Sequence, residues 1–403
     1  MLTGLVILFS LAWCYLFYRW RDVFSPWSLT LLVWVAIIFM YLTIDHGLYK
    51  ATDQFSYAVL LWVSMFTISS YVTCRLVPSN IGEEWKTNPK VLNFFTALSV
   101  VIAPYMLYKA IGFAMQNGSA DNLMYTLRDQ VTDEDSGFSL GPIAYYIHVV
   151  YVMLFVIADE KGKTKKSYFI FAMLMCFVFF FVQMSKIILF VCLLSTLYLF
   201  YANGKIRLRT IVLTMSAFAF LGILFTQLRT ADDGDTENTF TLMDLFSIYI
   251  VSPIVAFSYE VPNISDYWGY ETFRPLYNIF HAMGFTQVTP FNALAKDFVF
   301  VPFPTNVYTM MCPMFHDFGY WGIGVFASVE GVVMGYVYKK ANTGNTILRC
   351  LYAYFVAIIV LQFFDEQFFS GFSNIIQILL LIILFHVKIV WKTDKPFFFK
   401  KIR

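Results

Sequence analysis

The sequence predicts an all-α polytopic membrane protein, and three observations support that fold class. Of the 403 residues, 59% are hydrophobic and only 13% are charged, which is about half the charged fraction of an ordinary soluble domain. The mean hydropathy is +0.66. Apolar blocks long enough to cross a hydrocarbon core of about 30 Å recur along the whole chain. These features exclude a soluble globular enzyme, a disordered chain and a nucleic-acid-binding protein.

We expect about eleven transmembrane helices, each close to the length that a rise of 1.5 Å per residue requires. The block 167–201 contains one charge, Lys186, and as a single helix it would be about 52 Å long. It is therefore divided into two helices that meet at residues 183–186. The predicted spans are residues 2–18, 27–44, 55–74, 91–115, 142–158, 167–182, 187–201, 210–228, 319–338, 347–364 and 372–391.

The distribution of basic residues gives the orientation of these spans. If the N-terminus is outside and the C-terminus is cytoplasmic, 21 of the 28 Lys and Arg residues fall on the inner side, as the positive-inside rule requires. Arg19 and Arg21 follow the first apolar block instead of preceding it, so this block is interpreted as a retained helix and not as a signal peptide. The cations left on the outer side are Lys50, Lys109, Arg128, Lys186, Arg229, Arg274 and Lys296.

This topology divides the chain into three parts: an N-terminal bundle of eight helices (1–228), a large periplasmic loop (229–318) and a C-terminal bundle of three helices with a basic cytoplasmic tail (319–403). Structureless loops as long as the one at 229–318 are usually functional. Its seven prolines predict that it is divided into short helices and turns. Within it, residues 240–257 are apolar but interrupted by Asp244 and Pro253. We expect a re-entrant or interfacial helix here, with a spanning helix as the alternative.

Motifs of several enzyme classes are missing from the sequence. It contains no nucleotide-binding glycine loop, no zinc-protease motif and no serine elbow. The six cysteines have no metal-ligand spacing, and only Cys312 is expected in an exposed loop. Acidic clusters at 133–135 and 232–235 could hold a divalent cation, but acidic outer loops also follow from the positive-inside bias. We therefore predict no metal and no cofactor.

Glu330 is the clearest charge within a predicted span. An intramembrane acid is a functional candidate by default. The alternative, which we favour, is a carboxyl that hydrogen-bonds between helices beside Gly331 and Gly335, whose spacing lets two helices approach closely.

The most informative stretch precedes the ninth span. It contains Thr305-Asn306-Val307-Tyr308-Thr309, followed by His316-Asp317-Phe318-Gly319 and an apolar helix. A histidine beside an aspartate just outside a span provides a carboxylate and a proton acceptor that titrates near neutrality.

These motifs resemble those of oligosaccharide repeat-unit polymerases of the Wzy type, which build O-antigens and related surface polysaccharides. The shared elements are a T-N-x-Y-T segment and a (Y/H)-D-F-G-x-x-G turn into the next helix. Ser185-Lys186 and Arg274-Pro275 are similar to further elements of that family, and the layout, with one large outer loop late in the chain, is similar too.

The resemblance implies a glycosyltransferase of the bacterial cytoplasmic (inner) membrane. Such an enzyme transfers a sugar chain from undecaprenyl pyrophosphate to another lipid-linked repeat unit on the outer face, without a nucleotide or other cofactor. The implied partners are these lipid-linked oligosaccharides, the bilayer and a chain-length regulator protein, and no nucleic acid. The alternatives are an O-antigen ligase, a non-enzymatic flippase or transporter, and a membrane acyltransferase.

The candidate site residues follow from these roles. We expect His316 or Asp317 to assist deprotonation of the acceptor hydroxyl, with helix capping as the alternative for Asp317. Cationic side chains near the outer surface would bind pyrophosphate, although each could instead be a membrane anchor. Aromatic rings would pack against sugar rings, or else anchor the chain at the interface. The predicted substrate-binding residues are Lys186, Arg229, Arg274, Arg128, Trp268, Tyr270 and Tyr308.

Overall fold

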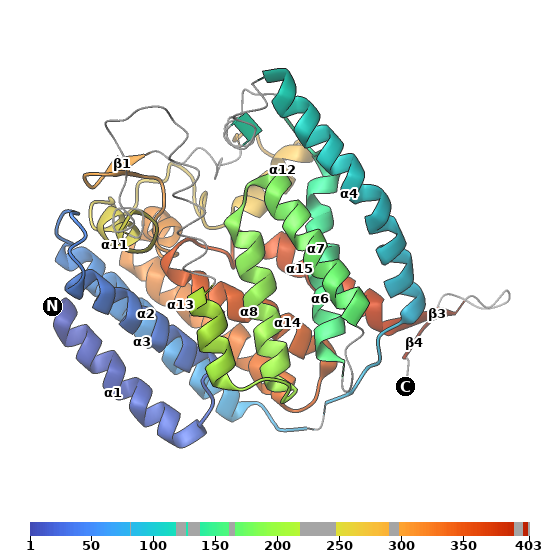
Figure 1. Cartoon of the computed structure of the whole chain (residues 1–403). Helices are drawn as coiled ribbons and strands as arrows, with labels where there is room; N and C mark the ends of the chain where they lie inside the picture. The colour runs from blue at the N-terminus through green and yellow to red at the C-terminus, as the bar shows by residue number, and fades with distance from the viewer. Residues whose placement is uncertain are drawn as a thin grey trace. The chain divides into compact units, whose positions relative to one another are not determined.

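The computed structural model describes residues 1–80, 82–117, 126–127, 138–160, 166–217, 247–289, 298–390 and 398–401, and most of them are helical (Figure 1). The chain forms two compact units. Unit 1 comprises Met1–Ser79, Asn238–Lys339 and Ile358–Ile375. Unit 2 comprises Asn80–Glu237, Lys340–Ala357 and Ile376–Arg403. Each unit therefore combines segments that are far apart in the sequence.

The described residues include eight helices long and apolar enough to cross a membrane, so the protein is a multi-pass membrane protein. They are α1 (Leu2–Trp20), α2 (Pro26–Thr43), α3 (Asp53–Leu76), α4 (Pro89–Asn117), η3 with α6 (Gly141–Tyr146 and Ile147–Asp159), α7 (Lys166–Gln183), α13 (Cys312–Asn342) and α14 with η5 (Thr346–Val360 and Leu361–Phe363). The shorter apolar helices are α8 (Lys186–Ala202), Leu208–Ala217, η4 with α11 (Ser247–Val251 and Ser252–Phe257) and α15 (Phe372–His386).

Each of the eleven predicted spans coincides with one of these helices, as far as the described residues reach. The number of crossings and their orientation stay predictions. The predicted division at 183–186 is confirmed, because α7 ends at Gln183, Met184 has a positive φ of 49°, and α8 begins at Lys186. The last helix ends earlier than predicted, at His386, and Val387–Val390 forms β3, which pairs with β4 (Phe398–Lys401).

Residues 247–257 form a short buried helix in unit 1. Its eleven residues rise about 16 Å, which is half of a hydrocarbon core. Every residue of α11 is buried, and Phe257 packs against Phe55 of α3 and Phe315 of α13. This segment thus lies within the protein and not on its surface, while residues 240–246 of the predicted re-entrant helix lie outside the described residues.

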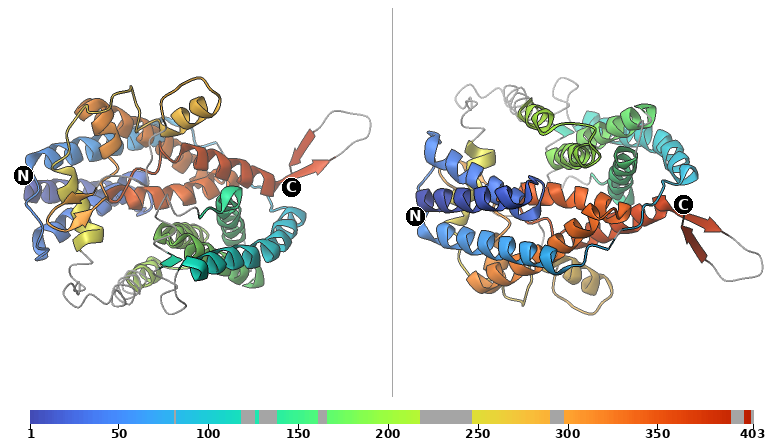
Figure 2. Two further views of the ribbon diagram at one scale, coloured as in Figure 1. Left: turned by 90° about the horizontal axis from the view of Figure 1, so that it is seen from above. Right: turned by 90° about the horizontal axis from the view of Figure 1, so that it is seen from below.

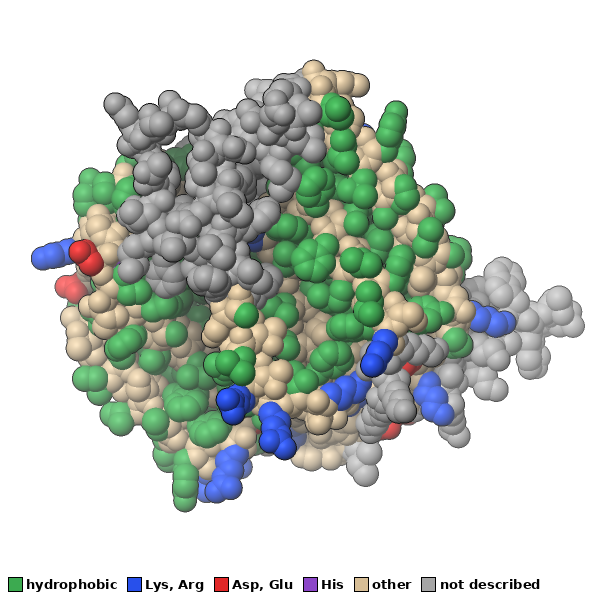
Figure 3. Space-filling view, viewed as in Figure 1, with side chains coloured by type: hydrophobic (Ala, Val, Ile, Leu, Met, Phe, Trp, Pro, Cys, Tyr) green, Lys and Arg blue, Asp and Glu red, His purple; other side chains and the backbone are tan. Residues whose placement is uncertain are grey.

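On the face shown in Figure 3, hydrophobic side chains outnumber charged ones among the described residues, as expected of a protein in lipid. In unit 1, α1, α2 and α3 lie side by side (Figure 2), and the outward face of α1 presents exposed Ile7, Leu11 and Tyr15.

Helices α3 and α13 approach closely at two glycines. A Cβ atom on Gly331 would lie 2.1 Å from Oγ of Ser69, and one on Gly335 would lie 2.4 Å from the carbonyl oxygen of Ser70. The close approach predicted from the glycine spacing is therefore confirmed. Glu330 beside them is fully buried, and its carboxyl group faces the side-chain amide of Gln362 in η5, so it lies between helices as predicted, although the two groups are farther apart than a normal hydrogen bond.

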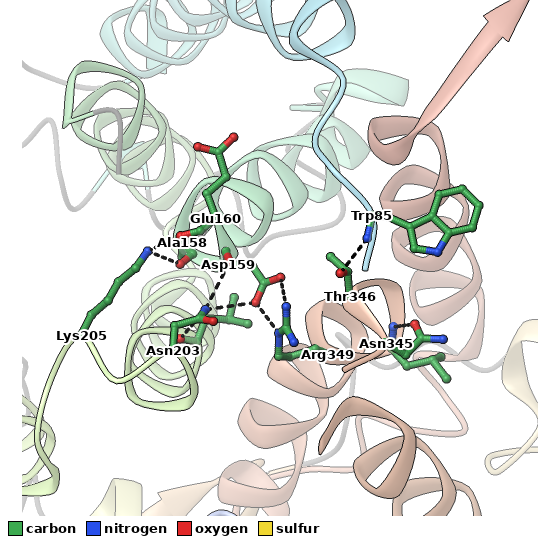
Figure 4. Close-up of polar contacts among 11 residues, drawn as sticks. Trp85, Ala158, Asp159, Glu160, Asn203, Lys205, Asn345, Thr346 and Arg349 are labelled. Atoms are coloured by element: carbon green, nitrogen blue, oxygen red, sulfur yellow. Dashed lines mark hydrogen bonds and ion pairs between the residues drawn. The ribbon is translucent and has the colours of Figure 1, made fainter. Parts of the chain in front are cut away.

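In unit 2, a buried ion pair joins the end of α6 to the start of α14 (Figure 4). The guanidinium of Arg349 donates to both carboxylate oxygens of Asp159, at 2.6 and 2.7 Å. Asn203, at the end of α8, donates to the same carboxylate at 3.2 Å, and Lys205 donates to the two neighbouring backbone carbonyls. One carboxylate thus connects three helix ends.

Candidate functional site

The site begins at an interruption of α13. Gly319 has φ 62° and ψ −153°, a backbone conformation that essentially only glycine adopts. In an uninterrupted helix the carbonyls of Phe315 and His316 would accept hydrogen bonds from residues four positions later. Here the backbone N–H groups of Asn263 and Ser265 donate to them instead, at 3.1 and 3.3 Å. The loop that precedes α13 therefore runs along the first turns of this helix.

This path brings two glutamates of the loop to His316. Nδ1 of His316 lies 2.8 Å from Oε1 of Glu271, and Nε2 lies 2.8 Å from Oε2 of Glu260. The three side chains are only 11–16% exposed. A neutral imidazole has one N–H, so both contacts are hydrogen bonds only if the ring is an imidazolium or one carboxyl is protonated. The site therefore holds a proton shared among three groups.

Asp317 holds the same loop from the next position. Its two carboxylate oxygens accept the backbone N–H groups of Glu271 and Thr272, at 3.3 and 2.7 Å. It therefore positions Glu271. The alternative interpretation, in which Asp317 caps the helix that follows, is not what these contacts show. We refer to Glu260, Glu271, His316 and Asp317 as the His316 cluster.

Glu260 is positioned by the start of α3. Nε2 of Gln54 donates to the carbonyls of Phe257 and Glu260, at 3.1 and 2.6 Å, and Oγ1 of Thr52 donates to the carbonyl of Ser258 at 3.0 Å. Sequence reasoning missed both glutamates, because each is an isolated acid 45 or more positions from His316. No local motif marks them.

Strand pairing and hydrogen bonds hold the T-N-x-Y-T segment (305–309) in place directly before α13. Strand β2 (Pro304–Thr305) pairs with β1 (Val299–Phe300), and Oγ of Ser252 donates to Oγ1 of Thr305 at 3.1 Å. Met310 N–H then donates to the carbonyl of Gln362 at 3.1 Å. Tyr308 is buried in this arrangement, and its predicted contact with substrate stays a prediction.

The predicted aromatic residues lie beside the His316 cluster. The ring of Trp268 is 74% exposed, stacks on Phe273 and meets the edge of Phe318, the residue after Asp317. The hydroxyl of Tyr270 donates to the carbonyl of Thr289 at 2.7 Å. Trp268 thus presents a free ring face next to the carboxylates, as a sugar-binding wall requires.

A tyrosine of the following helix lies close to the same carboxylates. The hydroxyl of Tyr277 donates to the carbonyl of Trp268 at 2.8 Å. Burial raises the pKa of Tyr277, and the negative charge of Asp317 adds to this shift. The phenol therefore remains a hydrogen-bond donor at neutral pH.

The predicted cations are placed only in part. Arg274 is the first residue of α12 (Arg274–Ala282) in unit 1, and Lys186 is the first residue of α8 in unit 2. Arg128 and Arg229 lie outside the described residues. Their convergence on one pyrophosphate stays a prediction.

Three groups of this site could hold a metal ion. Ligand atoms of Glu260, Cys312 and His316 all lie within 4.8 Å of one another. Cys312 is buried as the first residue of α13, so its predicted place in an exposed loop is wrong. Its Sγ lies 3.4 Å from Nε2 and 3.9 Å from Nδ1 of His316. A metal would need these side chains to move apart, and the present distances are those of hydrogen bonds.

Comparison with known proteins gives one result that bears on function. No family model matches the chain, and no solved structure matches it. A protein of Escherichia coli (strain K12) named "Putative O-antigen polymerase" is 25% identical over 396 residues, which cover 91% of this chain and 93% of that protein. Over nearly its whole length the chain is therefore similar to a protein named as an O-antigen polymerase, which supports the resemblance seen in the motifs.

Proposed function

We propose that the protein polymerises lipid-linked oligosaccharide repeat units on the outer face of the bacterial cytoplasmic membrane. The observation that carries this proposal is the similarity, over nine-tenths of the chain, to the Escherichia coli protein named as an O-antigen polymerase. The donor is a glycan on undecaprenyl pyrophosphate, which brings its own leaving group. The absence of a nucleotide-binding motif from the sequence is consistent with such a donor.

The His316 cluster is suited to accept the proton of the acceptor sugar. The hydroxyl oxygen of the acceptor attacks the anomeric carbon of the donor, the bond from that carbon to the phosphate oxygen breaks, and undecaprenyl pyrophosphate leaves with the electron pair. The carboxylate of Glu260, which faces Nε2 of His316, takes up the hydroxyl proton. Glu271 orients the ring through Nδ1, and the ring in turn holds Glu260 in place.

The negative charge of the His316 cluster indicates that the pyrophosphate of the donor binds at other residues. The His316 cluster has three carboxyl groups and one imidazole, so its net charge is negative even when the ring is protonated and the carboxyls are ionised. Such a cluster repels a pyrophosphate. The phosphates need cations elsewhere, for which Lys186, Arg229, Arg274 and Arg128 are the candidates.

Alanine substitutions test the donor side. We expect Lys186→Ala, Arg229→Ala and Arg274→Ala each to abolish polymerisation while the protein level is unchanged. Lysine at position 274 should restore activity only in part, because it lacks the bidentate fork. Lys50→Ala, at another outer cation, is the matched control. Full activity of Arg274→Ala would remove Arg274 from the donor site.

The polysaccharide profile of a deletion strain tests the proposed function as a whole. A polymerase predicts that long chains disappear while a single repeat unit remains on the acceptor. Complete loss of repeat-bearing acceptor would indicate a ligase or a flippase instead. Chains of normal length that lack acetyl groups would indicate an acyltransferase.

A further inference from the structure

Helix α12 is amphipathic, and its apolar face is exposed. Its apolar residues follow the spacing i, i+3, i+4, i+7 and so form one stripe. In a soluble domain this stripe faces the core, but no residue of α12 is buried. The four apolar side chains, the last of them from the residue directly after the helix, are 43%, 49%, 45% and 60% exposed: Leu276, Ile279, Phe280 and Met283.

The opposite face of α12 is polar. Arg274, Asn278 and His281 follow one another at spacings of four and three, so they share a face directed away from the apolar stripe. The helix contains no acidic residue. A short helix with one apolar face and one polar, basic face is the pattern of a segment that lies in the plane of a membrane surface.

The contacts before α12 place its start near the outer part of a predicted span. The ring of Phe273, directly before the helix, packs against Phe326 of α13 at 5.5 Å. Phe326 lies seven residues after Gly319, or about 10 Å along the helix axis. Trp268, whose ring meets Phe318, and Trp321 are more than 70% exposed close to Gly319, as indole rings at a membrane interface are.

We propose that α12 lies in the outer leaflet of the membrane, with Leu276, Ile279 and Phe280 among the acyl chains and Arg274 at the level of the phosphates. The exposed apolar stripe is then covered by lipid, which removes it from water.

This placement also indicates how the lipid-linked substrate reaches the site. That inference rests on the proposed function. Arg274 follows Glu271 by three residues, so a helix in the outer leaflet holds the loop side of the His316 cluster at the membrane surface. A polyprenyl chain can stay in the bilayer beside the apolar stripe of α12 while its pyrophosphate reaches Arg274. The substrate class is thus a lipid that enters sideways from the leaflet.

Spin labels on the full-length protein test the position of α12 without any assay of activity. The protein is placed in nanodiscs of phosphatidylethanolamine and phosphatidylglycerol, with the exposed Cys14 replaced by serine and labels at Ile279→Cys or Phe280→Cys. We expect these labels to collide more with oxygen than with a water-soluble nickel complex. A label at Asn278→Cys, on the polar face, is the matched control and should show the reverse. Nickel access at 279 and 280 equal to that at 278 would overturn the proposal.

A second measurement separates the membrane position from the role in substrate entry. Phe280→Asp places a charge in the apolar stripe and should shorten the polysaccharide at unchanged protein level, whereas His281→Asp, on the polar face and two turns from Arg274, should leave chain length as in the wild type. If the labels report insertion but Phe280→Asp makes chains of normal length, the role of α12 in substrate entry is refuted. The polymerase function itself is judged by the deletion strain.

Discussion

Glu271 and His316 are 45 positions apart in the chain, yet Oε1 of Glu271 lies 2.8 Å from Nδ1 of His316. The backbone N–H of the same glutamate donates to Asp317, so the loop and the start of α13 are held together through one side chain and one backbone group. This double contact fixes which nitrogen of His316 faces Glu271 and which faces Glu260. His316 is thereby oriented by a carboxylate, an arrangement that recurs in sites of acid–base catalysis.

The first prediction concerns Glu271. In Glu271→Gln the amide oxygen can still accept a hydrogen bond from Nδ1, but it carries no charge to stabilise an imidazolium. We expect a loss of polymerisation rate of about 10²-fold or more, since a positioned acid–base group contributes about 10²–10⁴-fold. The measurement is the chain-length distribution of the polysaccharide, together with immunoblots of the membrane fraction.

An exposed acid of the same loop provides the control for this experiment. Asp266→Asn removes one negative charge without touching His316, and we expect wild-type chain lengths. Glu260→Gln should behave like Glu271→Gln, because Glu260 contacts the other ring nitrogen. Normal chain lengths in both glutamine variants would contradict a role of the His316 cluster in the reaction.

The second prediction separates positioning from proton transfer at Asp317. Its two carboxylate oxygens each accept one backbone N–H, and in Asp317→Asn one of these donors loses its acceptor. An unsatisfied buried donor costs about 1–3 kcal/mol. We expect reduced but measurable polymerisation, together with faster chymotrypsin cleavage in the aromatic loop around Tyr267. Complete loss of activity with an unchanged cleavage rate would indicate that Asp317 is itself the base.

The third prediction concerns Gly319. A Cβ at this position would lie 3.1 Å from Nδ2 of Asn263, and the backbone conformation excludes other residues. Gly319→Ala should therefore regularise α13, displace the loop backbone at 263–265 and abolish polymerisation. Gly112→Ala in α4 is the matched control, because nothing lies within 4 Å of its added Cβ. Equal thermal stability and activity of the two variants would contradict this account of the interruption.

The helices could be predicted from the sequence because their signal is local. A run of apolar residues is long enough to span a bilayer whatever its neighbours are, and the division between α7 and α8 follows from the length of the run alone. The close approach at Gly331 was predictable for the same reason, because the glycine spacing lies within one helix.

Only two of the four residues of the His316 cluster could be predicted from the sequence. His316 and Asp317 are adjacent in a recognisable motif, but Glu260 and Glu271 reach them through the interruption at Gly319 and the backbone path of the loop. Such a path depends on tertiary contacts, including those of Gln54 from α3, and leaves no periodic trace in the sequence. Cys312 was misplaced for a related reason, because α13 begins seven residues before its apolar run.

The fourth prediction tests the ion pair of unit 2. Arg349→Ala removes the bidentate partner of the buried Asp159 carboxylate and leaves the hydrogen bond from Asn203, and losing one partner of such a pair costs about 3–5 kcal/mol. We expect a clear drop in thermal stability and in protein level. The double variant Asp159→Leu, Arg349→Leu should recover much of this loss, because no charge is left buried. A double variant no more stable than Arg349→Ala would contradict this explanation.

The last prediction is the topology itself, with eleven crossings, the N-terminus outside and the C-terminus cytoplasmic. It is motivated by the segregation of 21 of the 28 basic residues to one side. Reporter fusions after Lys166, Arg209 and Lys340 should all report cytoplasm, and a periplasmic signal from any of them would refute the arrangement.

A fusion after Asp266 is decisive for the loop that carries the His316 cluster. If Ser247–Phe257 were part of a spanning helix, Asp266 would be cytoplasmic, and Glu260, Glu271 and His316 could not meet a substrate on the outer face. The eleven-residue length of that helix and its burial among α3 and α13 lead us to expect a periplasmic signal at Asp266.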